Sequence, residues 1–162
     1  MNSGGVRASL FLAKSGVETV DGQVTYAEAF AVQPFGNTLV VKTCTGQQLY
    51  DVLNQQFNNP AVGSNRIMLP SANVDYHWTT VGGPHVVDGT LSFDDGATFV
   101  NKAASYRVVM NNFMADGGDG YTVFRSCTDP LGGDVDLDAF TAYLDAHKPV
   151  APPALDRIHK DA

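Results

Sequence analysis

The chain has 162 residues, of which 44% are hydrophobic and 17% charged, and its formal net charge is -7. This composition is that of a folded protein rather than a disordered one, and the length fits one domain that buries roughly two thirds of its unfolded surface. The ten Lys and Arg residues are scattered, which argues against a nucleic-acid groove or an anionic membrane surface as partner. No apolar stretch approaches the ~18 residues of a membrane helix.

The first residues lie in a glycine-rich turn. Met1 is followed by NSGGVRASL, without the charged lead or the apolar core of a signal peptide. We therefore expect Met1 to be an expression start and the chain to be a piece of a longer protein.

Two helix starts carry capping boxes, in which two side chains three residues apart each bond a free backbone amide. The segment Thr25-Tyr-Ala-Glu28 opens a short helix that ends near Gln33, because Pro34 disfavours helical geometry in the residue before it. A strand-length apolar run follows at Thr38–Thr43. The segment Thr45-Gly-Gln-Gln48 then opens a second helix. One face of that helix carries Leu49, Val52, Leu53 and Phe57.

The middle of the chain combines short strands with turns. Residues 58–65 are rich in turn formers, and Asp88-Gly89 and Asp94-Asp95-Gly96 mark two further turns. The strands predicted here are Arg66–Leu69, Tyr76–Thr80 and Val86–Val87.

The last third contains two predicted strands, Tyr106–Met110 and Tyr121–Phe124, which flank the glycine-rich loop NNFMADGGDG. A helix is predicted at Asp136–Ala146, and residues 149–162 are predicted to form an extended tail over the surface. Strands outnumber helices without strict alternation, which favours an α+β fold for a single domain of residues 1–162. The residues expected to face inward from the last helix are Leu137, Phe140 and Leu144.

Cys44 and Cys127 permit one pairing, and both are expected to lie at the ends of predicted strands. A disulfide and two buried thiols are both compatible with this placement.

Metal-binding and nucleophile motifs are absent from the sequence. The four histidines belong to no HExxH or Cys/His pattern, so we interpret each as a surface or packing residue. The segment DGGDG lacks the spaced carboxylates of a calcium loop. We find no GxSxG element and no histidine in a motif with either cysteine. The sequence therefore predicts no cofactor in this chain and no bond breaking by the chain alone. The histidines are His77, His85, His147 and His159.

Three other stretches stand out: NSGGVR, PFGN and NNFMADGGDGY. Both PFGN and NNFMADGGDGY place a phenylalanine in a glycine-containing turn beside Asn or Asp. Flat apolar faces with a few polar groups suit an aromatic heterocycle that carries hydroxyls. The alternative is that both rings fill the core, where most phenylalanines lie. In chain order the candidate residues are Asn2, Arg7, Phe35, Asn37, Phe113 and Asp119.

These three motifs, in this order, resemble the C-terminal domain of the 5′-nucleotidase family, which has bacterial and animal members. The resemblance runs from NSGGVRA through VTYAEAFAVQPFGNTLVVKTCTGQQLYDVL and NNFMADGGDGYTVF to the closing LDRI, and so covers nearly the whole chain. It implies layered mixed sheets with flanking helices. Leucine is more usual in the family at the position of Cys44.

The resemblance implies a role for each candidate residue. The positions of Phe35 and Phe113 match two phenylalanines that clamp the substrate base from opposite faces, and Asp119 matches an aspartate that receives the ribose hydroxyls. Asn37 matches a base contact of the bacterial enzymes, and Arg7 belongs to the phosphate grip. A further base-side contact, known from the animal enzyme, aligns with Asn2.

The chain also departs from the family pattern. In the family, hydrolysis occurs on a divalent metal pair in a separate N-terminal metallophosphoesterase domain, whose ligand motifs are absent here. Upstream arginines of the phosphate grip and a strand just before NSGG are missing too. We therefore expect a substrate-recognition part without phosphatase activity of its own, whose catalytic partner domain belongs to the same secreted, extracytoplasmic protein. The strand next to the missing one would present an open edge and favour a homodimer.

The leading hypothesis is thus a domain that recognises a nucleotide or nucleoside for a metal-dependent phosphohydrolase. A stand-alone binding or interaction module that lost its catalytic partner is the alternative. A third, purely structural role requires Phe35 and Phe113 to be fully buried and far apart.

Overall fold

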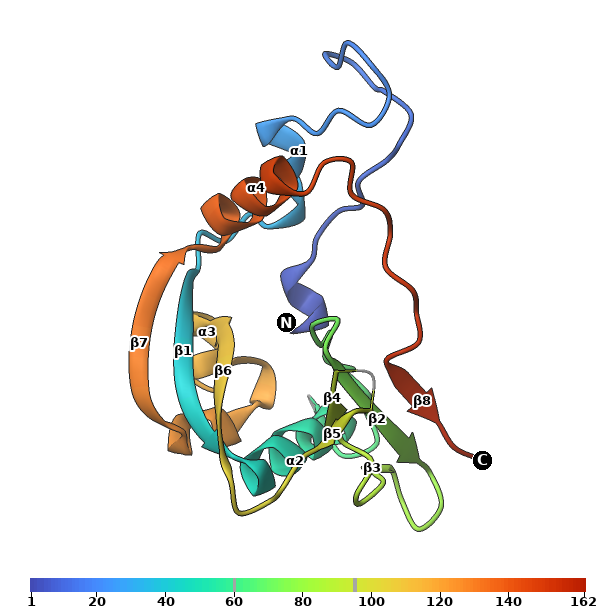
Figure 1. Cartoon of the computed structure of the whole chain (residues 1–162), viewed down its shortest axis with the longest axis vertical. Coiled ribbons are helices and arrows are strands. Elements are labelled where there is room, and N and C mark those ends of the chain that lie inside the picture. The colour runs from blue at the N-terminus through green and yellow to red at the C-terminus, as the bar shows by residue number, and fades with distance from the viewer. Residues whose placement is uncertain (60, 95) are drawn as a thin grey trace.

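The computed structural model describes residues 1–59, 61–94 and 96–162 and has an α+β architecture with two sheets (Figure 1). The first sheet has the order β6-β1-β7, with β1 (Thr38–Thr45) between β6 (Ser105–Asn111) and β7 (Thr128–Val135). Both pairings are antiparallel, and Val41 lies opposite Val109 and Leu131. The apolar run that predicted β1 is therefore the central strand of this sheet.

The second sheet is mixed and has five short strands among the described residues. Its order is β3-β2-β4-β5, and β8 pairs with β2 in parallel. The strands are β2 (Val74–Thr79), β3 (His85–Val86), β4 (Ser92–Phe93), β5 (Thr98–Phe99) and β8 (Ile158–Lys160). Residues 149–157 form no helix or strand, but the predicted tail then ends in β8, because its backbone completes the edge of β2.

All three helices predicted from the sequence are present, and two of them begin at their predicted capping boxes. Helix α1 (Tyr26–Val32) has the complete Thr25 capping box, and α2 (Gly46–Gln55) has that of Thr45. The predicted inner face of α2 is buried, including Phe57 in the following turn η2 (Gln56–Asn58). Helix α4 (Asp136–Ala146) has the predicted bounds, with Leu137 buried and the other two inward residues partly buried. It packs against α1 at one end of the first sheet (Figure 1).

The predicted strand Tyr121–Phe124 was wrong, because these residues lead into the 3-10 helix η4 (Thr122–Ser126). Tyr121 and Phe124 are both buried, with exposed fractions of 0% and 3%. Residues three apart share a face in a 3-10 turn, whereas in a strand they point to opposite faces. Burial of both rings in one core therefore overrides their strand propensity.

The predicted strand Arg66–Leu69 was also wrong, because this segment bonds to irregular partners instead of a strand. The Arg66 amide donates to the Gln56 carbonyl, and the Met68 amide donates to the Gln56 side chain. The predicted turn at 58–65 contains Pro60, and that at 94–96 contains Asp95. These two residues lie outside the described part of the chain.

A single apolar core extends from α2 to both sheets, and Tyr76, Phe57 and Tyr121 are its largest fully buried side chains. Cys44 and Cys127 form a disulfide that links β1 to the residue before β7, which settles the question that the sequence left open. Within the described residues, no helix is both long and apolar enough to span a bilayer.

Candidate functional site

A pocket of about 450 Å³ lies where the N-terminus, the start of β1 and the segment after β6 meet. All six candidate residues from the sequence line it. Arg66 and Asn111 also line it, and the sequence did not single them out. The turns η1 (Ser3–Gly5) and η3 (Gly118–Gly120) and the short helix α3 (Asn112–Ala115) supply part of its wall. The lining residues are Asn2, Gly4, Gly5, Arg7, Phe35, Asn37, Arg66, Asn111, Phe113 and Asp119.

The two phenylalanine rings are exposed, with 57% of Phe35 and 44% of Phe113 accessible to solvent. The purely structural alternative required both rings to be buried and far apart, and it is wrong on both points. Phe35 precedes Gly36, whose φ of +61° turns the chain between α1 and β1. The Arg7 guanidinium lies 5.8 Å from the centre of the Phe35 ring, within range of a cation–π contact.

Phe113 is part of a short helix, whereas the sequence predicted a loop. The Asn111 side chain caps this helix, because its Oδ1 accepts the Met114 amide at 2.9 Å. Met114 points into the core, with 1% exposed. Because Met114 is buried in the core, the neighbouring Phe113 side chain lies on the pocket side of the helix. The capped helix holds the backbone of Phe113 in place.

The Asp119 carboxylate is held from both sides. Its Oδ2 accepts a hydrogen bond of 2.6 Å from Asn2 Nδ2, and its Oδ1 pairs with Arg66 Nη1 at 2.5 Å. The Asp119 backbone is left-handed, with φ of +53°, a conformation that aspartate tolerates better than most residues. Each carboxylate oxygen has a second lone pair, so the fixed group can still accept hydrogen bonds from a hydroxylated ligand.

Arg66 is the principal site residue that sequence reasoning missed. It lies 53 residues from Asp119 and belongs to no motif. Its carbonyl accepts a 2.5 Å hydrogen bond from the hydroxyl of Tyr121, and burial raises the pKa of Tyr121 to about 12. The neutral phenol therefore fixes the backbone that carries Arg66.

Asn2 is buried, with 3% exposed, although it lies next to the first residue of the chain. Its backbone amide donates to Met114 Sδ, and its Nδ2 is used by Asp119. Within the described residues, Asn2 Oδ1 has no hydrogen-bond partner.

Lys42 fixes the segment behind Phe113 from the buried side of β1. Its Nζ donates to the carbonyls of Phe124 at 2.6 Å and Ala115 at 3.4 Å. Only 8% of Lys42 is exposed. One buried ammonium thus ties the end of α3 and the turn η4 to the central strand.

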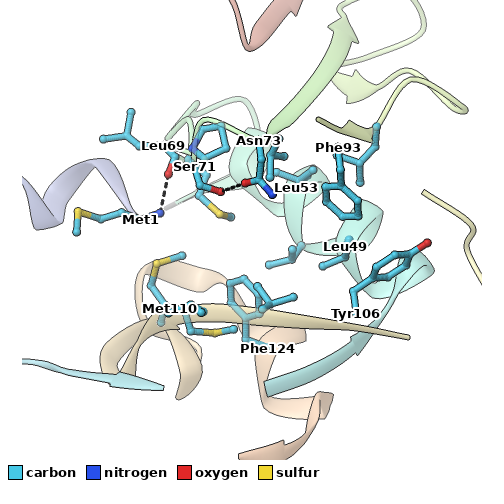
Figure 2. A pocket seen from close by; sticks show the side chains of 18 of the residues that line it. Met1, Leu49, Leu53, Leu69, Ser71, Asn73, Phe93, Tyr106, Met110 and Phe124 are labelled. Atoms are coloured by element: carbon cyan, nitrogen blue, oxygen red, sulfur yellow. Dashed lines mark hydrogen bonds between the residues drawn. The ribbon is translucent and has the colours of Figure 1, made fainter. Parts of the chain in front are cut away.

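A second cavity of about 600 Å³ lies between α2, β6 and the segment from Met68 to Val74 (Figure 2). Figure 2 shows Leu49, Leu53, Phe93 and Phe124 around it. Its walls are mainly apolar side chains, whereas the first pocket combines exposed rings with fixed polar groups. Only the first has the character of a site for a polar heterocycle.

Comparison with known proteins decides the family. The family model for the 5′-nucleotidase C-terminal domain matches residues 1–126. The chain belongs to this family. A solved structure of the 5′-nucleotidase precursor from Thermus thermophilus has a TM-score of 0.80 and 31% identity, and the match covers 98% of this chain and 30% of that chain.

Two relatives are much longer than this 5′-nucleotidase C-terminal domain. The trifunctional nucleotide phosphoesterase protein YfkN of Bacillus subtilis is 34% identical over 148 residues, which is 88% of this chain and 9% of that protein. A cell wall protein of Listeria monocytogenes is 30% identical over 149 residues, or 91% of this chain and 18% of that protein. The chain thus spans less than a fifth of the length of either relative.

Proposed function

We propose that this domain recognises the base and ribose of a nucleotide or nucleoside for a metal-dependent 5′-nucleotidase-type phosphohydrolase. The observation that carries the proposal is the shared pocket: two exposed phenylalanines and a fixed carboxylate line the same 450 Å³ space. A purine or pyrimidine has flat faces that can stack on two rings lining one pocket.

In this proposal the base lies between Phe35 and Phe113. Stacking on an aromatic ring contributes about 1–3 kcal/mol per base in nucleic-acid proteins. Asn37 is the hydrogen-bonding group for the edge of the base, and Asn2, which also lines the pocket, is the second base-side residue.

Asp119 accepts the ribose hydroxyls, because its carboxylate is oriented by two donors before any ligand arrives. Orientation in advance lowers the entropy cost of binding. Arg7 is the cation for the phosphate. It is exposed, lines the pocket and contacts the ring of Phe35.

The test is an NMR titration of the full chain with adenosine and with AMP, since chemical shifts report millimolar binding. We expect saturable shifts at Phe35, Phe113 and Asp119, with AMP the tighter ligand. Phe113→Ala should weaken both ligands at least about fivefold, the lower part of the range for one stacking contact.

Phe99→Ala is the matched control, because Phe99 is also an exposed phenylalanine (63%) but lies on β5 of the other sheet. Equal affinities in the two variants, or no shifts with either ligand, would contradict a base clamp in this domain.

We further propose that the chemistry resides in an N-terminal metallophosphoesterase domain of the same protein, on a divalent metal pair. The match covers only 9% and 18% of the length of two relatives, which leaves room for further domains in such proteins and supports that arrangement. The recognition domain would place the phosphate at the metals, so its contribution is positioning. The isolated domain should release no phosphate from AMP. Coding sequence upstream that lacked metal-ligand motifs would instead support the stand-alone module.

We propose an extracytoplasmic location for the parent protein. Two observations support it: the disulfide between Cys44 and Cys127, which persists in oxidising compartments, and the similarity to a cell wall protein. Fractionation of the source cells, followed by immunodetection, tests this directly.

Self-association through an open strand edge also remains a proposal. Strand β6 is an edge of the first sheet, and Val109 on it is 61% exposed. Edge strands with exposed apolar residues favour addition of another strand. Light scattering at high concentration should detect a dimer that Val109→Lys reduces. A monomer at every concentration would contradict it.

A further inference from the structure

The C-terminal strand brings two histidines together that are far apart in the sequence. Strands β2 and β8 pair in parallel, and His77 lies opposite His159 in the register. Side chains two residues apart share a face of a strand. Asp75 and His77 of β2 therefore share one face with His159 and with Asp161, which follows β8.

The four side chains are in direct contact. His77 Nδ1 lies 2.9 Å from Asp161 Oδ1, and His159 Nε2 lies 2.8 Å from Asp75 Oδ2. The two imidazole rings stack with their centres 4.6 Å apart. One ligand atom from each of Asp75, His77 and His159 lies within 4.8 Å of the other two.

The surrounding charges suit a cation at this place. Asp75 and Asp161 both contribute carboxylates, whereas Lys160 points to the opposite face, where its ammonium lies 5.3 Å from the Trp78 ring. Arg157, which precedes β8, extends to the carbonyl of Pro70 instead.

We propose that Asp75, His77 and His159 form a binding site for a divalent transition metal, of which zinc is the best match. Two imidazoles and one carboxylate are a common set of three protein ligands for Zn²⁺, with metal–ligand bonds of ~2.0–2.2 Å. Such bonds place tetrahedral ligand atoms about 3.3 Å apart. The ligand atoms now lie within 4.8 Å of one another, so metal binding requires the two stacked imidazole rings to rotate until their nitrogens converge on the ion.

Asp161 has a different role in this site. In the proposed site the Asp161 carboxylate accepts the N–H of His77 Nδ1, and the Nε2 atom of that ring binds the metal. Carboxylates that accept the second N–H of a ligating histidine orient the ring and raise its basicity. The site holds the C-terminal strand on β2, because two ligands come from β2 and one from β8. Bound metal would thus stabilise the docking of the last residues, which follow a segment without helix or strand.

The experiment is calorimetric titration of the untagged, oxidised full chain with ZnCl₂, with MgCl₂ and CaCl₂ as comparison ions. Both cysteines are in the disulfide, so thiolates do not compete for zinc. We expect one zinc per chain and much weaker binding of the other two ions, which prefer oxygen ligands. His77→Gln and His159→Gln should each weaken zinc binding at least about tenfold.

His147→Gln is the matched control, because His147 is a surface histidine that stacks on Tyr143 of α4. It should leave zinc affinity unchanged. In the wild-type chain, imidazole NMR signals of His77 and His159 should shift with the first equivalent of zinc, before those of His85 and His147. This readout needs no variant to fold. Equal zinc affinity in wild type and His159→Gln, equal binding of magnesium, or simultaneous shifts of all four histidines would overturn the proposal.

Discussion

Gly118 lies directly against the ring of Phe113: a Cβ atom at Gly118 would approach three carbons of that ring to 2.5–2.6 Å. Contacts below 3.0 Å do not persist, so one of the two groups would have to move. Gly118 therefore has a specific role: without a side chain, its backbone in η3 can contact the Phe113 ring directly. This contact explains why a large ring and a flexible backbone occur together in NNFMADGGDGY.

Gly118→Ala should displace Phe113 without unfolding the domain. The ring is 44% exposed and can rotate away, so we expect a loss of about 1 kcal/mol in unfolding free energy. Adenosine affinity should fall at least about fivefold, because one face of the clamp is lost. NMR titration and urea denaturation measure the two effects. Gly132→Ala is the control, since a Cβ there meets no atom within 4 Å.

Arg66→Met should weaken recognition of the sugar more than recognition of the base. Without the guanidinium, the Asp119 carboxylate keeps only its contact with Asn2 and becomes less ordered. We expect adenosine binding to weaken about two- to fivefold, in keeping with the loss of one charged contact, while binding of free adenine is unchanged.

Arg107→Met serves as the comparison for Arg66→Met. The guanidinium of Arg107 also donates to a side chain, the Thr43 hydroxyl, but it lies on β6 outside the pocket. If Arg66→Met lowered adenine and adenosine affinity equally, a role through Asp119 would be refuted.

Reduction of the disulfide should destabilise the domain strongly. The bond joins Cys44 and Cys127, which are 83 residues apart, and closure of a loop of that length corresponds to about 4.5 kcal/mol of unfolded-state entropy at 25 °C. Urea denaturation of the wild type with and without dithiothreitol measures the change. The double variant Cys44→Ala, Cys127→Ala should be insensitive to the reductant. A midpoint that reductant leaves unchanged in the wild type would contradict the prediction.

Stability should fall in alkaline solution through two buried tyrosines. Burial raises the pKa of Tyr76 and of Tyr121 to about 12, whereas the unfolded value is about 10. Because the folded pKa is raised, this contribution is complete below pH ~10 and is lost as the pH rises toward ~12. Near pH ~12, the raised pKa of each tyrosine should lower the free energy of unfolding by about 2 kcal/mol.

Urea denaturation at about pH 9 and about pH 11.5, with tyrosinate absorbance in parallel, measures this loss. Tyr121→Phe should reduce this loss of unfolding free energy by about half. If all six tyrosines titrated near their ordinary pKa, the predicted alkaline destabilisation would be contradicted.

The local elements could be predicted from the sequence because their determinants lie within a few residues of each other. The Thr25 and Thr45 boxes act over three residues, the apolar run of β1 is continuous, and the inward stripe of α4 repeats at helical spacing. The six candidate residues were found through ordered motifs and a family resemblance, and they line one pocket. Their binding roles remain proposals.

The tertiary structure decided what depends on residues distant in the chain. Arg66 reaches Asp119 across 53 residues, Cys44 bonds to Cys127 across 83, and His77 meets His159 only because β8 pairs with β2. The 3-10 turn at Tyr121 likewise follows from its place in the shared core. Local propensity contains no information on such encounters, because their free energy exists only after the chain has folded and brought the partners together.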